Sequence, residues 1–161
     1  IWQATVKITY NHRGSFTWKT TRYRTYTRIF VPEGSRLITS SGALRNDRLL
    51  DPSQKEGIVD QGRELGLTTF GAFTSIEPGE QRDLIFVYEL PESVQKAIEE
   101  NRYGLTVFKQ PGSFTSALTL HLDFDKTLKT ATPSEAIGDW GDDVYSLNTK
   151  LDQDVEVSMG F

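Results

Sequence analysis

Apolar and polar residues alternate along most of this chain, and that period of two constrains the fold more than any other feature. From Trp2 to Tyr10 every second residue is apolar or aromatic, and the residues between them are Gln, Thr and Lys. Successive side chains of a β-strand point to opposite faces of the sheet, so a half-buried strand produces this pattern. Similar runs predict further strands at 22–31, 36–40, 58–65, 68–76, 82–90, 105–110, 114–124 and 152–159.

Turn sequences separate these runs and predict how some of them connect. A hairpin tip is expected near Gly66, and Gln110–Ser113 is expected to join the strands on either side of it into a second hairpin. Pro91 and Glu92 open a pattern with helical spacing, which predicts one short helix near 92–102. Residues 129–143 are rich in Gly and Asp, and we expect them to form a loop.

These elements predict an all-β fold with one short helix. An antiparallel β-sandwich, immunoglobulin-like or jelly-roll-like, suits the number and length of the strands best, and a closed barrel is the alternative. The chain shows no repeat and no linker, so we expect residues 1–161 to form a single domain. Because the chain begins at Ile1 and its only methionine is Met159, we expect this domain to be excised from a larger protein.

Composition excludes several kinds of chemistry. The chain has no cysteine, which rules out disulfides, zinc–thiolate sites and iron–sulfur clusters. Its net charge of −4 gives no indication of nucleic-acid binding. The charge is uneven, since residues 1–50 carry nine cations against Glu33 and Asp47, and residues 123–161 carry nine acids against three lysines. The two regions are expected to neutralise each other across neighbouring strands, and the alternative is a two-signed surface that meets partners.

Catalytic residues are not expected. The sequence lacks Gly-x-Ser-x-Gly, and its two histidines, His12 and His121, have no metal-ligand spacing. Asp123 and Asp125 share strand parity, as a glycosidase pair would, but nothing in the sequence indicates that either is desolvated, and a solvated strand end is the expected explanation.

Two groups of residues are candidate binding sites. The basic, aromatic segment from Trp18 to Arg28 places three arginines and a tyrosine on one strand face, and it could bind an anionic polymer; the alternative is that these arginines pair with acidic neighbours. Its candidate residues are Arg22, Arg24, Tyr26 and Arg28. The loop Asp139-Trp140-Gly141-Asp142-Asp143 offers Asp139, Asp142 and Asp143 as calcium ligands, and an ordinary acidic loop is the alternative.

Four parts of the chain form a set with a recognisable resemblance: Tyr23–Gly34, Glu64–Gly66 with Phe70–Phe73, Glu77–Glu80 and Lys109–Gly112. These segments resemble an uncharacterised family of large, membrane-anchored bacterial surface proteins from candidate-phylum and Gram-positive bacteria. The resemblance implies a C-terminal extracytoplasmic domain of unknown function, located at the cell surface or outside the cell. We therefore expect a non-enzymatic structural or adhesive module whose partner is a cell-wall polymer or another surface protein. An anionic-polymer or carbohydrate-binding domain and a carboxylate-dependent hydrolase are the alternatives.

Overall fold

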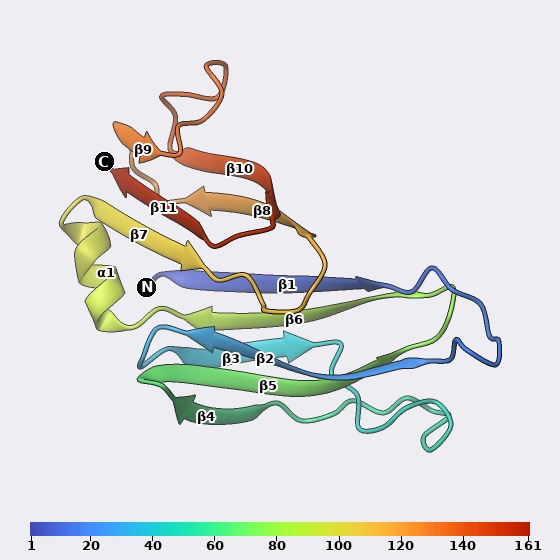
Figure 1. Ribbon diagram of the computed structural model, residues 1–161. Coiled ribbons are helices and arrows are strands. Elements are labelled where there is room, and N and C mark those ends of the chain that lie inside the picture. The colour runs from blue at the N-terminus through green and yellow to red at the C-terminus, as the bar shows by residue number, and fades with distance from the viewer. The chain divides into compact units, whose positions relative to one another are not determined.

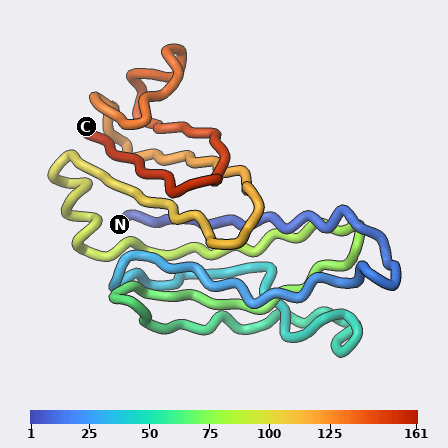
Figure 2. Tube along the Cα trace, in the orientation of Figure 1, coloured from blue at the N-terminus to red at the C-terminus, as the bar shows by residue number.

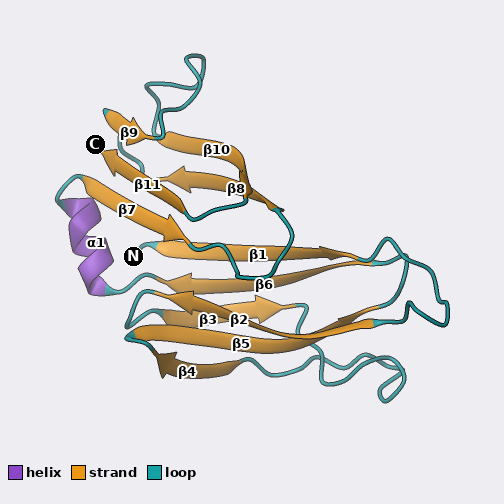
Figure 3. Cartoon of the chain, viewed as in Figure 1, coloured by secondary structure: helices purple, strands orange, loops and turns teal.

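The computed structural model describes all residues, 1–161, with half of them in strands and a single short helix (Figure 1, Figure 3). Every strand pairing is antiparallel. The predicted all-β, sandwich-like fold with one helix is therefore confirmed. The chain divides into two compact units, residues 1–92 and 93–161, each with its own sheets. That residues 1–161 form one domain stays a prediction.

The first unit contains six strands in two three-stranded sheets. The strands are β1 (Gln3–Asn11), β2 (Tyr23–Val31), β3 (Arg36–Ser41), β4 (Asp60–Glu64), β5 (Leu67–Ile76) and β6 (Gln81–Glu89). One sheet has the order β1–β6–β3 and the other β2–β5–β4. The pair β2–β5 lies within the pair β1–β6 along the sequence, as in a double-stranded ribbon wrapped around a core. The chain trace can be followed in Figure 2. This connection fits the jelly-roll-like alternative of the predicted sandwich.

The period of two decides which side chains enter the core of this unit. Leu84 and Phe86 occupy alternate positions of β6, Phe70 and Ala72 occupy alternate positions of β5, and all four are fully buried. The rings of Phe70 and Tyr88 come from the two different sheets, and their centroids lie 5.8 Å apart. The two sheets therefore bury their inner faces against each other, as the alternation predicts.

β4 and β5 form the predicted hairpin, with Leu65 and Gly66 as its two-residue turn. Both turn residues have positive φ, 54° for Leu65 and 73° for Gly66. A type I′ turn requires this conformation, because its twist matches that of the flanking strands. Glycine adopts it without strain, whereas a leucine with a Cβ does not.

The second unit is built around a smaller core of aromatic and aliphatic side chains. Its elements are α1 (Glu92–Glu99, which begins at the boundary), β7 (Arg102–Val107), β8 (Ser116–Asp123), β9 (Thr130–Thr132), β10 (Val144–Leu151) and β11 (Val155–Gly160). They form the sheets β7–β11–β9 and β8–β10. The ring of Phe124 lies 4.9 Å from that of Tyr103 and 4.7 Å from that of Phe161. Lys126 donates to the carbonyl of Ile98 and so satisfies the C-terminal end of α1.

The second unit differs from the prediction at four points, and the predicted hairpin between β7 and β8 is wrong. β7 and β8 do not form a hairpin, because β7 pairs with β11 and β8 pairs with β10. β10 was not predicted as a strand, and β9 lies inside the predicted loop 129–143. The predicted strand 152–159 begins only at Val155. Alternation identifies a strand but not its partner, so pairing between distant segments does not follow from the pattern.

α1 spans eight residues, and no helix of this structure has the length and hydropathy that crossing a bilayer requires.

The strained turn gives a stability prediction. Leu65 is largely exposed, so replacing it with Asn removes little buried surface and introduces a residue that tolerates positive φ. We expect Leu65→Asn to raise the free energy of unfolding by about 0.5–1 kcal/mol, measured by urea denaturation. The control is Leu49→Asn, at an exposed leucine without positive φ, which should not stabilise the protein. Equal effects of the two substitutions would contradict the assignment of strain to the turn.

Candidate functional site

The four residues predicted to bind an anionic ligand lie along or just before β2. The strand begins at Tyr23, close to the predicted start at residue 22, so Arg22 precedes it and Trp18 lies in the loop between β1 and β2. Arg24, Tyr26 and Arg28 share the exposed face of the strand, as strand parity predicts. The surface formed by Arg22, Arg24, Tyr26 and Arg28 is termed the arginine face.

Each arginine of this face is paired with a carboxylate. The guanidinium of Arg22 contacts both carboxylate oxygens of Glu77, at 2.8 and 3.3 Å, and this pair is largely buried. Arg24 pairs with Asp47. Arg28 lies 2.6 Å from an oxygen of Glu64, and both side chains are about half exposed. The predicted alternative, pairing with acidic neighbours, therefore describes the arginines of this face.

Tyr26 completes the arrangement by spanning the central strand of its sheet. Its hydroxyl donates to Asp60 of β4, and its ring passes over Gly71 of β5. A Cβ at Gly71 would lie 2.4 Å from the Tyr26 hydroxyl oxygen, so only glycine leaves room for the ring. The hydrogen bond to Asp60, together with burial, raises the pKa of Tyr26 above its ordinary value. Tyr26 therefore fastens β2 to β4 across β5.

The carboxylates that neutralise the basic region come from the first unit itself. The side chains paired with cations of residues 1–50 belong to residues 47–89. The acids of residues 123–161 take part in no ion pair. The first unit therefore supplies the carboxylates for these cations itself, and β1 and β2 also pair with strands of this unit. Mutual neutralisation of the two oppositely charged regions stays a prediction. A polar hollow of about 240 Å³ remains beside Tyr26 and Arg28.

Asp47 is the most buried acid of the arginine face, with only 2% of its surface exposed. Its carboxylate accepts hydrogen bonds from the backbone N–H groups of Leu49 (2.8 Å) and Leu50 (3.1 Å) as well as from Arg24. The Arg24 guanidinium lowers the pKa of Asp47 below its ordinary value; burial opposes this effect, and the two N–H groups add to it. Asp47 thus connects the loop before β4 to the edge strand β2.

This lowered pKa predicts a pH dependence of stability. Because the unfolded chain binds the Asp47 proton more readily, the ionised carboxylate stabilises the fold above its unfolded pKa of about 3.9, and this contribution is lost as pH falls through the lower folded pKa. Asp47→Asn keeps an oxygen for the turn but removes the charge. We expect it to lower stability at pH 7 and to flatten the decline of melting temperature on acidification.

Glu56→Gln is the matched control, since Glu56 is an exposed acid of the same segment that forms no ion pair. Thermal melts from pH 2 to pH 7 compare the three proteins. If Asp47→Asn and Glu56→Gln behaved alike, the structural role of the Arg24–Asp47 pair would be refuted.

The acidic residues of the second unit come together differently from the prediction. Carboxylate oxygens of Asp123, Asp125 and Asp143 lie within 4.8 Å of one another, and this trio is termed the acidic group. Asp143 belongs to both the predicted set and the acidic group, whereas Asp139 and Asp142 lie outside the group. The Asp142 carboxylate instead accepts a hydrogen bond from the backbone N–H of Val144 at 3.0 Å. The pairing of Asp123 with Val144 explains this arrangement, because it places the end of β8 beside the start of β10.

Three exposed carboxylates this close repel one another, and a divalent cation would relieve the repulsion. We expect millimolar Ca²⁺ to raise the melting temperature of the chain and of Asp139→Asn, whose substituted residue lies outside the group. Asp143→Asn should lose this response and be more stable than the original chain when Ca²⁺ is absent. Differential scanning fluorimetry with and without Ca²⁺ makes the comparison. An unchanged melt would show that the acidic group is an ordinary solvated surface.

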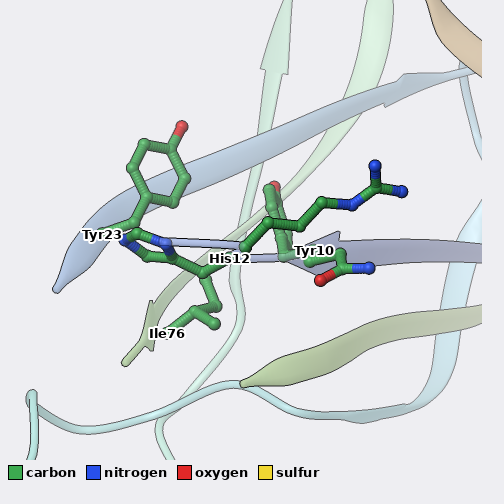
Figure 4. Close-up of a pocket in the computed structure, with 6 residues that line it drawn as sticks. Tyr10, His12, Tyr23 and Ile76 are labelled. Carbon is green, nitrogen blue, oxygen red and sulfur yellow. The ribbon is translucent and has the colours of Figure 1, made fainter. Parts of the chain in front are cut away.

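A further hollow of about 280 Å³ lies at one end of the first unit, where β1 ends and β2 begins (Figure 4). It is termed the end hollow, and it is lined by Tyr10, Asn11, His12, Arg13, Tyr23 and Ile76. No binding residue was predicted among residues 11–15, which lie between two predicted strands. The sequence did contain a signal for a binding site in this region. No acid occurs between Asn11 and Pro32, while aromatic and basic residues are frequent there.

Comparisons with known proteins add no relative. No family model, no curated protein and no solved structure matches the chain. The geometry of the described residues is therefore what supports the proposals below.

Proposed function

We propose that this chain is a non-enzymatic, extracytoplasmic adhesive module of a membrane-anchored bacterial surface protein, and that it contacts its partner through the loop between β1 and β2. The observation that carries the proposal is the display of aromatic side chains on this loop. Trp18 is 89% exposed and Phe16 is 59% exposed. Exposed aromatic residues beside cations are typical of surfaces that bind other molecules.

The loop is held in shape although it is exposed. The backbone N–H of Thr17 donates to the carbonyl of Thr20 at 2.9 Å, and the Thr17 hydroxyl accepts from the N–H groups of Lys19 and Thr20. The Lys19 ammonium lies 4.6 Å from the centre of the Trp18 ring. A closed turn at the loop tip reduces the entropy that binding would cost.

The charged groups of both units also support a non-catalytic module. The arginines of the arginine face pair with neighbouring carboxylates, and all three residues of the acidic group are exposed, so no carboxylate of that group is desolvated as a catalytic acid would be. A polyanion approaching the arginine face would meet the paired carboxylates as well as the guanidinium groups. Binding of an anionic polymer there is therefore the weaker alternative, and hydrolysis by carboxylates is weaker still.

The test is an adhesion assay with beads coated with the whole chain. Retention is measured under flow on surfaces coated with purified bacterial wall polysaccharide, and Trp18→Ala is expected to reduce it severalfold. Phe114→Ala is the matched control, because Phe114 is 96% exposed but belongs to the second unit. The proposal fails if coated beads are retained no better than bare ones, or if Trp18→Ala has no more effect than Phe114→Ala.

A further inference from the structure

The end hollow has the size of a site for one ring. Its volume of about 280 Å³ lies just below the roughly 300–1,000 Å³ of pockets that hold drug-sized ligands. Figure 4 shows the side chains of Tyr10, His12, Tyr23 and Ile76 gathered around it. Such a hollow accommodates a single residue of a longer polymer rather than several residues together.

Its walls are largely aromatic and fixed before any ligand arrives. The ring centroids of Tyr10 and Tyr23 lie 6.1 Å apart, and Ile76 beside them is buried. The Tyr10 hydroxyl is hydrogen-bonded to the Thr27 hydroxyl, which holds the Tyr10 ring against the sandwich. Two such rings offer apolar faces to the C–H side of a sugar ring with little loss of side-chain entropy.

His12 contributes to the shape of the end hollow. Its Nδ1 accepts from the backbone N–H of Gly14 at 3.2 Å, so the ring proton lies on Nε2, which donates to the Thr21 carbonyl at 2.9 Å. Both ring nitrogens are thereby occupied. The His12 backbone is also fixed, through hydrogen bonds with Gly79 and Glu80 of the turn between β5 and β6.

Arg13 supplies the charge of the end hollow. It forms no ion pair, in contrast with the three arginines of the arginine face. The nearby turn between β5 and β6 carries Glu77 and Glu80, but these pair with Arg22 and Arg48 respectively. The positive charge of Arg13 is therefore uncompensated, and the hollow attracts an anionic group.

We propose that the end hollow binds one carboxylate-bearing sugar residue, such as a uronic acid, of an acidic polysaccharide. The sugar ring packs against Tyr10 and Tyr23, the carboxylate pairs with Arg13, and the Asn11 amide is available to a hydroxyl group. A polymer with phosphate groups on sugar rings would also pair with Arg13. A phosphate on an acyclic backbone would pair with Arg13 but would leave Tyr10 and Tyr23 without a ring to pack against. This inference rests on the proposed adhesive function and names the ligand class that the adhesion recognises.

Isothermal titration of the whole chain with trigalacturonate at low salt tests the proposal. Arg13→Gln is expected to weaken binding about tenfold, because a hydrogen bond to a charged group is lost. Arg45→Gln is the matched control, since Arg45 is another exposed arginine without an ion pair, and it should change the affinity less than twofold. Tyr23→Ala should also weaken binding, whereas Tyr23→Phe should preserve it. Circular dichroism melts confirm that each variant is folded.

Two other ligands test whether the hollow requires the negative charge, the sugar ring or both. Maltotriose, a neutral trimer, is expected to bind at least tenfold more weakly than trigalacturonate. If an oligomer of glycerol phosphate bound as tightly as trigalacturonate, the hollow would be an anion site without preference for a sugar ring, and the proposal would be overturned. Equal weakening by Arg13→Gln and Arg45→Gln would overturn it as well.

The outcome separates this inference from the proposed function. If coated beads adhere through Trp18 but trigalacturonate does not bind, the assignment of the end hollow is wrong and the adhesive function stands. If trigalacturonate binds through Arg13 but coated beads do not adhere to any wall polysaccharide, the chain recognises the sugar and the adhesive function is wrong.

Discussion

Every second side chain of the strands is buried between the two sheets of the first unit, and the other features of this unit depend on that burial. Phe70, Leu84 and Phe86 are fully buried there, and burying apolar surface contributes about 25 cal/mol per Å². Because a strand has a period of two, the residues between the buried ones must point outward. The position of Arg24, Tyr26 and Arg28 on one outer face is thus a consequence of the core.

That outer face carries charges of both signs, and these charges pair with one another. Its arginines are matched by Glu77, Asp47 and Glu64, which come from three different segments of the first unit. These pairs connect the edge strand β2 to the loop before β4, to β4 itself and to the turn after β5. In the loop between β1 and β2, Arg13 and Lys19 form no ion pair, so cations without a carboxylate partner and exposed aromatic rings occur together there.

The sequence was sufficient to predict features that depend on local pattern. The alternation identified both faces of β2 and the inner face of β6, and Gly66 marked the hairpin between β4 and β5. Partners distant in sequence could not be predicted in this way. The pairing of β7 with β11 and the meeting of Asp123 with Asp143 depend on which strands become neighbours, and a period of two is the same for every neighbour. For the same reason, the three arginines were found from the sequence while the carboxylates that neutralise them were not.

The central claim is that the ligand binds at the end of the first unit, near the loop between β1 and β2, whereas the arginine face stabilises the fold. Mapping amide chemical shifts of the isotopically labelled chain during titration with an acidic polysaccharide fragment tests this claim most directly. The account predicts that shifted amides cluster at residues 10–23 and 76–80. Shifts concentrated along residues 24–31 and 60–64, with residues 10–23 unchanged, would contradict it.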